Sequence, residues 1–313
     1  MSESETIEPI VLRPIDERRI EQAVTLHESD LSDDDRWYLH SILTQCFMPY
    51  RDPKKNQWVK RNGHYGIAIQ SGILPDLQTD EGVVEVGIPY GAKPRLINSY
   101  VQTYAVKHRT PIIPIANSMS GFMKTLGFKV TGGAKGSIRG FQEQCTRLST
   151  SKWTIWGPKG QGREQGISLE NAEPFKRIDL WYPSDPEQKT LWPSELELTN
   201  DFFESLINHA IPYDYRALKI LRSNARAQDI YLWLTQRLYR IPRTRPLYLS
   251  YNELFDMFGG GIAEKRKFPD KFDEALQTAL LAYQDARVEK KDKFGFIFKT
   301  SNPPIPKVQT FIK

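Results

Sequence analysis

The chain contains little of what metal sites and disulfide frameworks require. Its 313 residues include two cysteines, Cys46 and Cys145, and five histidines. Two cysteines cannot form a disulfide framework, and because both lie within apolar patterns we expect buried thiols. The histidines are scattered, without the His-x-His or Glu-x-x-His spacing of a metal site. We therefore expect no bound metal, and a metal-dependent nicking nuclease would lack its ligands.

The sequence also lacks a long hydrophobic run. No apolar segment approaches the length of a membrane span, and the N-terminus is acidic, unlike that of a signal peptide. We expect a soluble, cytoplasmic protein with no membrane partner.

A glycine-rich stretch, residues 132–137, resembles a phosphate-binding loop only in composition. It reads Gly-Gly-Ala-Lys-Gly-Ser, without the Gly-x-x-x-x-Gly-Lys-Ser/Thr order, and no apolar strand leads directly into it. We interpret it as a flexible turn before a helix, where backbone N–H groups and Lys135 are suited to hold a backbone phosphate. The sequence predicts no catalytic residue and no cofactor.

Charge is distributed unevenly along the chain. Residues 1–35 contain eleven acidic and three basic side chains, although the whole chain has a formal charge of +5. From Lys93 to Gly160 there are eleven lysines and arginines and a single acid, Glu143. Such an excess is typical of a surface that faces phosphates, and a solvated face kept soluble by charge is the simpler alternative.

One pattern occurs twice, about 132 residues apart. Residues 111–127 and 246–259 each contain a short apolar strand, a capping serine, a helical stretch and a glycine. In each copy a basic stretch and a second amphipathic helix follow. Strand, helix, turn, helix and hairpin is the order of a winged helix-turn-helix. We therefore predict an α+β fold of two tandem winged-helix domains with small antiparallel sheets.

The predicted organisation has four parts: an acidic N-terminal tail and helix (1–35), a first winged-helix domain (36–182), a linker (183–192) and a second winged-helix domain (193–313). Ser32 and the acids after it predict a helix that ends at Pro49, because acids stabilise the first turn of a helix. Ser250 and Glu253 predict a capping box.

The hairpins that follow each repeat are the predicted wings. Residues 152–156 are expected to pair with residues 175–181 across the glycine-rich loop 157–166, which forms the first wing. Residues 287–289 and 294–298 are expected to form the second wing around Lys290–Lys293. The second helices of the two repeats are predicted over residues 137–150 and 268–283.

Polar residues on these second helices are the candidates for contacts to base edges. We predict such contacts from Arg139, Glu143 and Arg147, and from Lys267, Lys271, Glu274 and Gln277. Phosphate contacts are predicted from basic residues in turns, wings and helix ends: Lys93, Arg95, Lys124, Lys135, Lys159, Arg163, Arg266 and Lys290. Among the base-edge candidates, the carboxylates of Glu143 and Glu274 are useful because a carboxylate accepts a hydrogen bond from a cytosine amino group. The i, i+4, i+8 spacing of the first set also suits salt bridges on any solvated helix, so that interpretation stays open.

Several stretches of the chain resemble RepA-type plasmid replication initiators of broad-host-range plasmids. The resemblance covers roughly residues 50–304 and rests on the order of its motifs: Gly87–Arg95, Met119–Gly127, the glycines Gly132, Gly133 and Gly136, Gln144–Leu148, Asp179–Trp181, Leu191–Ser194, Asp229–Leu234 and Lys267-Phe268. Residues 1–35 lie outside it.

The resemblance implies tandem winged-helix domains that bind repeated double-stranded DNA sequences at a plasmid origin in a bacterial cytoplasm. It further implies binding as a monomer, a possible homodimer, and recruitment of host initiator and helicase proteins. Two alternatives remain at this point: a sequence-specific transcriptional repressor, and a DNA-processing enzyme such as a relaxase or primase.

Overall fold

The protein combines helices with small antiparallel sheets. The computed structural model describes residues 14–76, 82–115, 118–133, 136–159, 166–172, 174–178, 195–291 and 293–306, and at 14–16, 159, 166–172 and 177–178 it describes the backbone alone. Across this part of the chain five small sheets, all antiparallel, lie among the helices, which confirms the α+β class. Among the same residues no helix is both long enough and apolar enough to span a bilayer.

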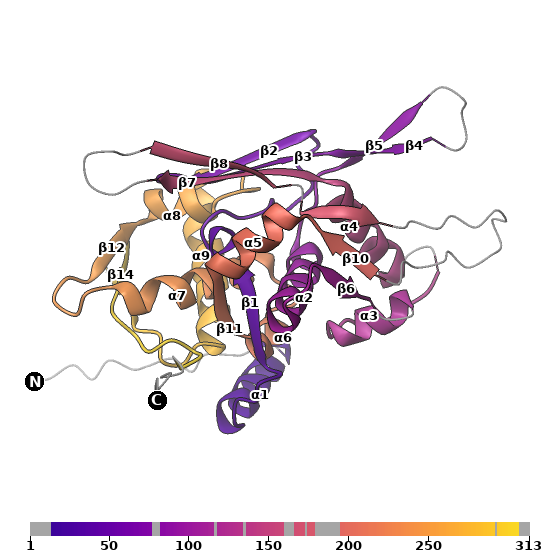
Figure 1. Cartoon of the computed structure of the whole chain (residues 1–313). Coiled ribbons are helices and arrows are strands. Elements are labelled where there is room, and N and C mark those ends of the chain that lie inside the picture. The colour runs from indigo at the N-terminus through magenta and orange to yellow at the C-terminus, as the bar shows by residue number, and fades with distance from the viewer. Residues whose placement is uncertain are drawn as a thin grey trace, which may run out of the picture.

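The N-terminal half carries the largest sheet. Its elements are α1 (Pro14–Glu28), β1 (Arg36–His40), the 3-10 helix η1 (Ser41–Thr44), β2 (Gln57–Asn62), β3 (Tyr65–Gln70), β4 (Gly72–Pro75), β5 (Val83–Gly87), α2 (Ala92–His108), β6 (Ile112–Pro114), α3 (Met119–Thr125), α4 (Ser137–Thr150), β7 (Lys152–Lys159), β8 (Gly166–Ala172) and β9 (Phe175–Ile178). The sheet of order β2-β3-β7-β8 lies over one side of the helices, and the β4–β5 hairpin projects beyond it (Figure 1).

The C-terminal half is mostly helical and ends in a three-stranded sheet. Its elements are β10 (Glu195–Leu198), α5 (Asn200–His209), β11 (Ala210–Asp214), α6 (Tyr215–Ile220), α7 (Ala225–Arg237), η2 (Leu238–Arg240), β12 (Leu247–Ser250), α8 (Tyr251–Phe258), η3 (Lys265–Lys267), α9 (Phe268–Leu281), β13 (Val288–Lys291) and β14 (Gly295–Phe298). The last sheet has the order β12-β14-β13.

The two halves share one hydrophobic core. Strand β1 pairs with β11, and β10 pairs with both β6 and β9, so strands from both halves form common sheets. Buried side chains from α2 in the first half and α7 in the second belong to the same apolar cluster. The predicted linker, residues 183–192, lies outside the described residues.

A buried ion pair links α2 to α7 at the centre of this core. The guanidinium of Arg95 binds Asp229 through two hydrogen bonds, Nε to Oδ1 at 2.7 Å and Nη2 to Oδ2 at 2.8 Å. Its other N–H groups donate to the carbonyl oxygens of Met48, Pro49 and Gly91. All five donors of the guanidinium are therefore used inside the protein.

The aromatic ring of Tyr50 extends this cluster to a second arginine. The guanidinium carbon of Arg95 lies 5.1 Å from the ring centre and that of Arg226 lies 4.6 Å from it. Arg226 in turn donates to the carbonyl oxygens of Phe258 and Gly260 at the end of α8. The buried pair is thus connected to the turn between α8 and α9.

The helix predicted from Ser32 to Pro49 does not form, and this prediction is wrong. Ser32 and Asp35 do bond to each other as in a helix cap, but residues 33–35 form only a turn and β1 begins at Arg36. Residues 36–40 instead pair with β11, and two N–H groups on the strand's other edge donate to α2, Tyr38 to Thr103 Oγ1 and His40 to Gln102 Oε1. These tertiary hydrogen bonds satisfy the strand on both edges and override the local helix signal.

The predicted pairing of β7 is also wrong. Strand β7 pairs with β8, residues 166–172, and β9 pairs with β10 instead. The sequence interpretation placed a glycine-rich loop at residues 157–166 and assigned no strand to residues 167–174, whereas residues 166–172 form β8. A hairpin at this place is still present, with a different second strand.

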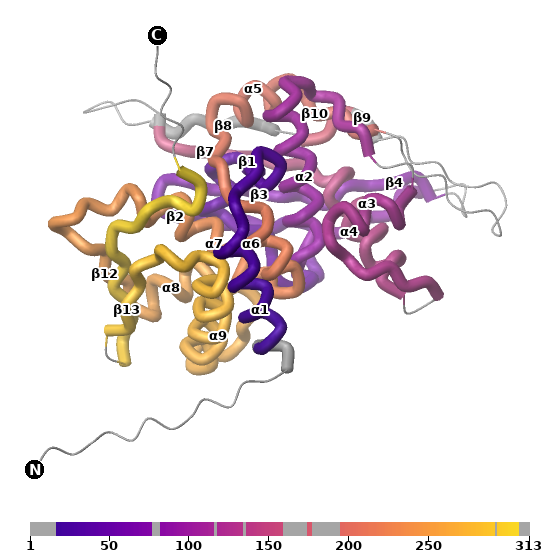
Figure 2. Tube along the Cα trace, turned by 90° about the horizontal axis from the view of Figure 1, so that it is seen from below, coloured from indigo at the N-terminus to yellow at the C-terminus, as the bar shows by residue number. Residues whose placement is uncertain are grey.

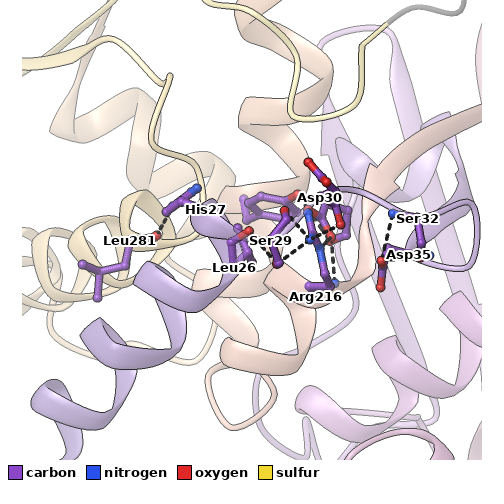
Figure 3. Close-up of polar contacts among 10 residues, drawn as sticks. Leu26, His27, Ser29, Asp30, Ser32, Asp35, Arg216 and Leu281 are labelled. Atoms are coloured by element: carbon purple, nitrogen blue, oxygen red, sulfur yellow. Dashed lines mark hydrogen bonds and ion pairs between the residues drawn. The ribbon is translucent and has the colours of Figure 1, made fainter.

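Helix α1 is fastened to the C-terminal half by polar contacts around Arg216 (Figure 3). The Arg216 side chain donates to the carbonyl oxygens of Ser29 and Asp30 and pairs with Asp214 at 2.8 Å. His27 Nε2 lies 3.0 Å from the carbonyl oxygen of Leu281, at the end of α9. The helix packs against α6 and α9, and Figure 2 shows it on the side away from the large sheet.

Removing one partner of the central ion pair should be costly. We expect Arg95→Met to lower the free energy of unfolding by about 3–5 kcal/mol, because the Asp229 carboxylate is left buried without its partner. Urea unfolding measures the change, and the double variant Arg95→Met/Asp229→Leu should recover much of the loss. Equal midpoints for the wild type and Arg95→Met would contradict this role.

His40 should make the protein sensitive to mild acid. Burial, with a smaller contribution from His209, lowers the pKa of His40 to about 4 from its ordinary value near 6.5. The neutral ring fits its contacts: Nδ1 accepts from the Ile42 N–H, and Nε2 then donates to Ser205 Oγ. Since the unfolded chain binds a proton more readily, stability is full above pH 6.5 and falls by about 3 kcal/mol as the pH drops toward 4.

Unfolding midpoints across this pH range test the role of His40. His40→Asn keeps an acceptor at the start of η1 but cannot titrate, so its stability should depend less steeply on pH than that of the wild type. The quantity to compare is the slope of stability against pH, because His40→Asn also loses the packing of the ring and so lowers stability at every pH. Two parallel pH profiles would exclude His40 as the titrating group.

Candidate nucleic-acid interface

The end of the C-terminal half has the strand, helix, turn, helix and hairpin order predicted from the repeat. Ser250 begins α8 in the predicted capping box, accepting from the Glu253 N–H while the Glu253 carboxylate accepts from the Ser250 N–H. Helix α9 follows after η3 and packs against α7 and α8, burying Phe268, Phe272 and Leu276, and the Phe272 ring contacts a ring of β14. This burial fixes which face of α9 turns outward.

The outward face of α9 contains the residues expected to read bases. Its exposed side chains are Asp270, Lys271, Glu274 and Gln277, and Lys267, the residue directly before the helix, is exposed too. Lys265 and Arg266 lie just before the helix and are exposed as well. The face thus combines cations with amide and carboxylate groups, which are the donors and acceptors that meet base edges.

Three cations at the start of α9, Arg266, Lys267 and Lys271, form surface ion pairs. Glu264 pairs with Arg266 at 2.7 Å and with Lys267 at 2.5 Å, and Lys271 lies 4.0 Å from Glu274. Hydrogen bonds from Lys267 and Arg266 lower the pKa of the Glu264 carboxyl. Because such exposed pairs contribute little, these cations are free to exchange a carboxylate for a phosphate.

A polar contact joins the C-terminal hairpin to α9. Lys290 on β13 pairs with Asp273 on α9 at 2.6 Å, and the Tyr251 hydroxyl donates to the same carboxylate at 2.7 Å. The hydrogen bond from Lys290 to Asp273 raises the pKa of Lys290. Burial, together with the hydrogen bond from Tyr251 to the same carboxylate, raises the pKa of Tyr251 to about 12. The sequence interpretation missed Asp273, and its spacing from Lys290 gave no signal of the contact.

The N-terminal half contains the matching helices but joins its strands differently. Ser118 begins α3 by accepting from the Gly121 N–H, as predicted, and α3 packs against α4. Strand β6, which precedes α3, pairs with β10 and is not joined to the β7–β8 hairpin within the described residues. The first unit is therefore extended by a strand from the other half.

Three predicted site residues of the N-terminal half have accessible charges. Lys124 on α3 and Arg139 on α4 are exposed. Lys93 is half-buried, and a Cβ at Gly140 would lie only 2.8 Å from its Nζ, so the lysine packs onto α4. Burial lowers the pKa of Lys93, and Glu143 acts in the opposite direction.

Arg95 and Arg147 do not fit the contacts predicted for them. Arg95 is buried with every donor used, as described above, so it has no N–H for a phosphate. Arg147 is largely buried: it pairs with Asp52 at 3.2 Å and Glu143 at 2.9 Å, donates to the Ile88 carbonyl oxygen, and lies over the Tyr90 ring. Both arginines hold α2 or α4 in the fold, and Glu143 is partly occupied with Arg147.

Three further predicted contacts cannot be located. Lys135 and Arg163 lie outside the described residues, and of Lys159 only the backbone in β7 is described.

The described residues contain no group of three or more histidine, cysteine or acidic side chains arranged to hold a metal ion. Both cysteines are free thiols. Burial raises the pKa of Cys46 to about 12, which keeps this thiol protonated at neutral pH.

Comparison with known proteins gives one match. No curated protein and no solved structure matches the chain. A family model described as plasmid encoded RepA protein matches residues 88–252, from the end of β5 to the start of α8. The matched segment includes α2, α7 and the ion pair between them, and it covers more than half of the chain. The chain therefore belongs to the family of plasmid encoded RepA proteins, and it is a plasmid replication protein.

Proposed function

We propose that the protein initiates plasmid replication by binding repeated double-stranded DNA sequences at the plasmid origin through two winged-helix units. It binds each repeat as a monomer, forms a homodimer as a second state, and helps to recruit host initiator and helicase proteins. No catalytic site and no cofactor take part. The observation that carries this proposal is the outward face of α9 beside the β13–β14 hairpin.

The geometry of the second unit supports sequence recognition. In winged-helix proteins the second helix enters the major groove and the hairpin contacts the flanking backbone. Helix α9 has the length and the mixed polar face for that role, and Lys290 and Lys291 lie on the adjacent hairpin. Carboxylates repel phosphates, so Glu274 is useful mainly where it meets a base donor.

The first unit suits backbone contacts. Lys124 and Arg139 are exposed on its two helices, whereas Arg147 is tied into the fold. We therefore assign most phosphate binding to the first unit, including Arg139, which the sequence analysis placed at base edges, and most base discrimination to α9.

Nuclease protection on the DNA that flanks the gene for this protein tests the proposal. We expect protected repeats at the origin, and support of an origin plasmid when the protein is supplied in trans. Protection without replication support would favour a transcriptional repressor. Nucleotide incorporation or strand cleavage by the purified protein would favour a primase or relaxase.

Phosphate contacts should make binding depend on salt. We expect affinity for the protected repeat to fall steeply with salt, and Lys124→Ala or Arg139→Ala to weaken binding to all sequences and to lower the log–log salt slope by about one. Fluorescence anisotropy at several salt concentrations measures both. Arg18→Ala, which removes an exposed cation from α1, is the matched control and should leave the slope unchanged. Equal slopes for all four proteins would contradict phosphate contacts from α3 and α4.

Substitutions on α9 should change preference more than overall affinity. We expect Gln277→Ala or Glu274→Ala to cost about 1–3 kcal/mol at particular base pairs and little elsewhere. Selection of preferred sites from random duplexes measures this, with Gln22→Ala on α1 as the control. Identical base preferences for wild type and both α9 variants would show that α9 does not make the base contacts that determine sequence preference.

A further inference from the structure

The C-terminal hairpin exposes an aromatic side chain that the fold itself does not use. Phe294, in the turn between β13 and β14, is 70% exposed, more than any other large hydrophobic residue that the structure describes. Lys291 and Lys293, which precede it in the chain, are exposed as well. The hairpin thus presents an apolar ring next to cations.

The backbone under Phe294 is fixed by the start of α8. The Tyr251 N–H donates to the Phe294 carbonyl oxygen at 2.8 Å. At the next residue, Gly295, a Cβ would lie 2.2 Å from the Leu249 carbonyl oxygen and 2.8 Å from Ser250 Cα. Only glycine permits this close approach, so the turn is pressed against the end of β12.

The hairpin is also held firmly beside α9. Phe296, on β14, is buried and its ring centre lies 5.7 Å from that of Phe272 on α9. On the neighbouring strand, Lys290 pairs with Asp273 of the same helix. The backbone of Phe294 is therefore tied to elements that pack on the helix whose outward face is exposed, so this residue needs little further ordering when a ligand binds.

We propose that Phe294 inserts between adjacent base pairs of duplex DNA, from the minor groove that flanks the sequence read by α9. This inference rests on the proposed function. Apolar wedges of this kind partly unstack a base step and kink the duplex, and cations next to the wedge can bind the flanking phosphates. Lys291 and Lys293 supply those charges. Burial of the ring between bases removes it from water, which the folded protein alone does not achieve.

The test uses the full chain and a duplex that contains one protected repeat. 2-Aminopurine is placed in turn at each step beside the repeat, and bending is measured by the mobility of circularly permuted fragments. For the wild type we expect increased fluorescence at one step and a bend centred there. For Phe294→Ala we expect both signals to disappear and affinity to fall by roughly one to two orders of magnitude. Its salt slope should not change, since no charge is removed.

Matched variants separate the wedge from its surroundings. Phe294→Leu should retain part of the bend, because leucine also serves as a wedge. Lys293→Ala should lower the salt slope by about one and keep the fluorescence signal. Ile73→Ala removes an exposed apolar side chain from the β4–β5 hairpin and should change neither signal. Because Phe294 is exposed, its variants should unfold at the wild-type urea midpoint.

The outcomes for the inference and for the proposed function are distinct. If the wild type protects no DNA, the proposed function fails. If the wild type protects the repeat while Phe294→Ala binds and bends it equally well, the insertion of Phe294 is overturned and the DNA-binding function stands. Affinity lost by Phe294→Ala without any fluorescence change in the wild type would also overturn insertion.

Discussion

The architecture depends on the buried pair between Arg95 and Asp229. A guanidinium in the interior is tolerated only when its donors are satisfied, and here one carboxylate and three carbonyl oxygens take all five. Those partners come from α7, from the segment before β2 and from Gly91, the residue directly before α2. The pair therefore holds the two halves in one relative position. An apolar contact of the same size would allow more relative positions, because it lacks directional hydrogen bonds.

The same cluster reaches the candidate interface. Arg226 lies over the Tyr50 ring next to Arg95 and binds the carbonyl oxygens that end α8. The turn that sets α9 against α8 is thus anchored to the junction between the halves. Two units joined in this way have a fixed spacing, so under the proposed function the distance between their contacts on DNA is a property of the fold.

Sequence patterns were informative where the determinants are local. The capping box at Ser250 and the burial stripe of α9 follow from neighbours within a few residues, and both are present in the structure. Strand β1 was missed because the groups that satisfy its edges, on β11 and α2, are distant in sequence. The same limit applies to the candidate site. Arginine is usually exposed, so nothing near Arg95 or Arg147 in the sequence signals burial; their partners Asp229 and Asp52 come from other elements.

The pairing of β1 with β11 has a consequence for the order of events during synthesis. Strand β1 leaves the ribosome long before its partner β11. At bacterial rates of elongation, on the order of ten seconds pass between the two. Until residues 210–214 emerge, the edge of β1 and its aromatic side chains have no strand to join. Contacts of such long range also slow folding. Until β11 has emerged, the nascent N-terminal half therefore exposes an unpaired strand edge, which is the kind of site that chaperones protect from aggregation.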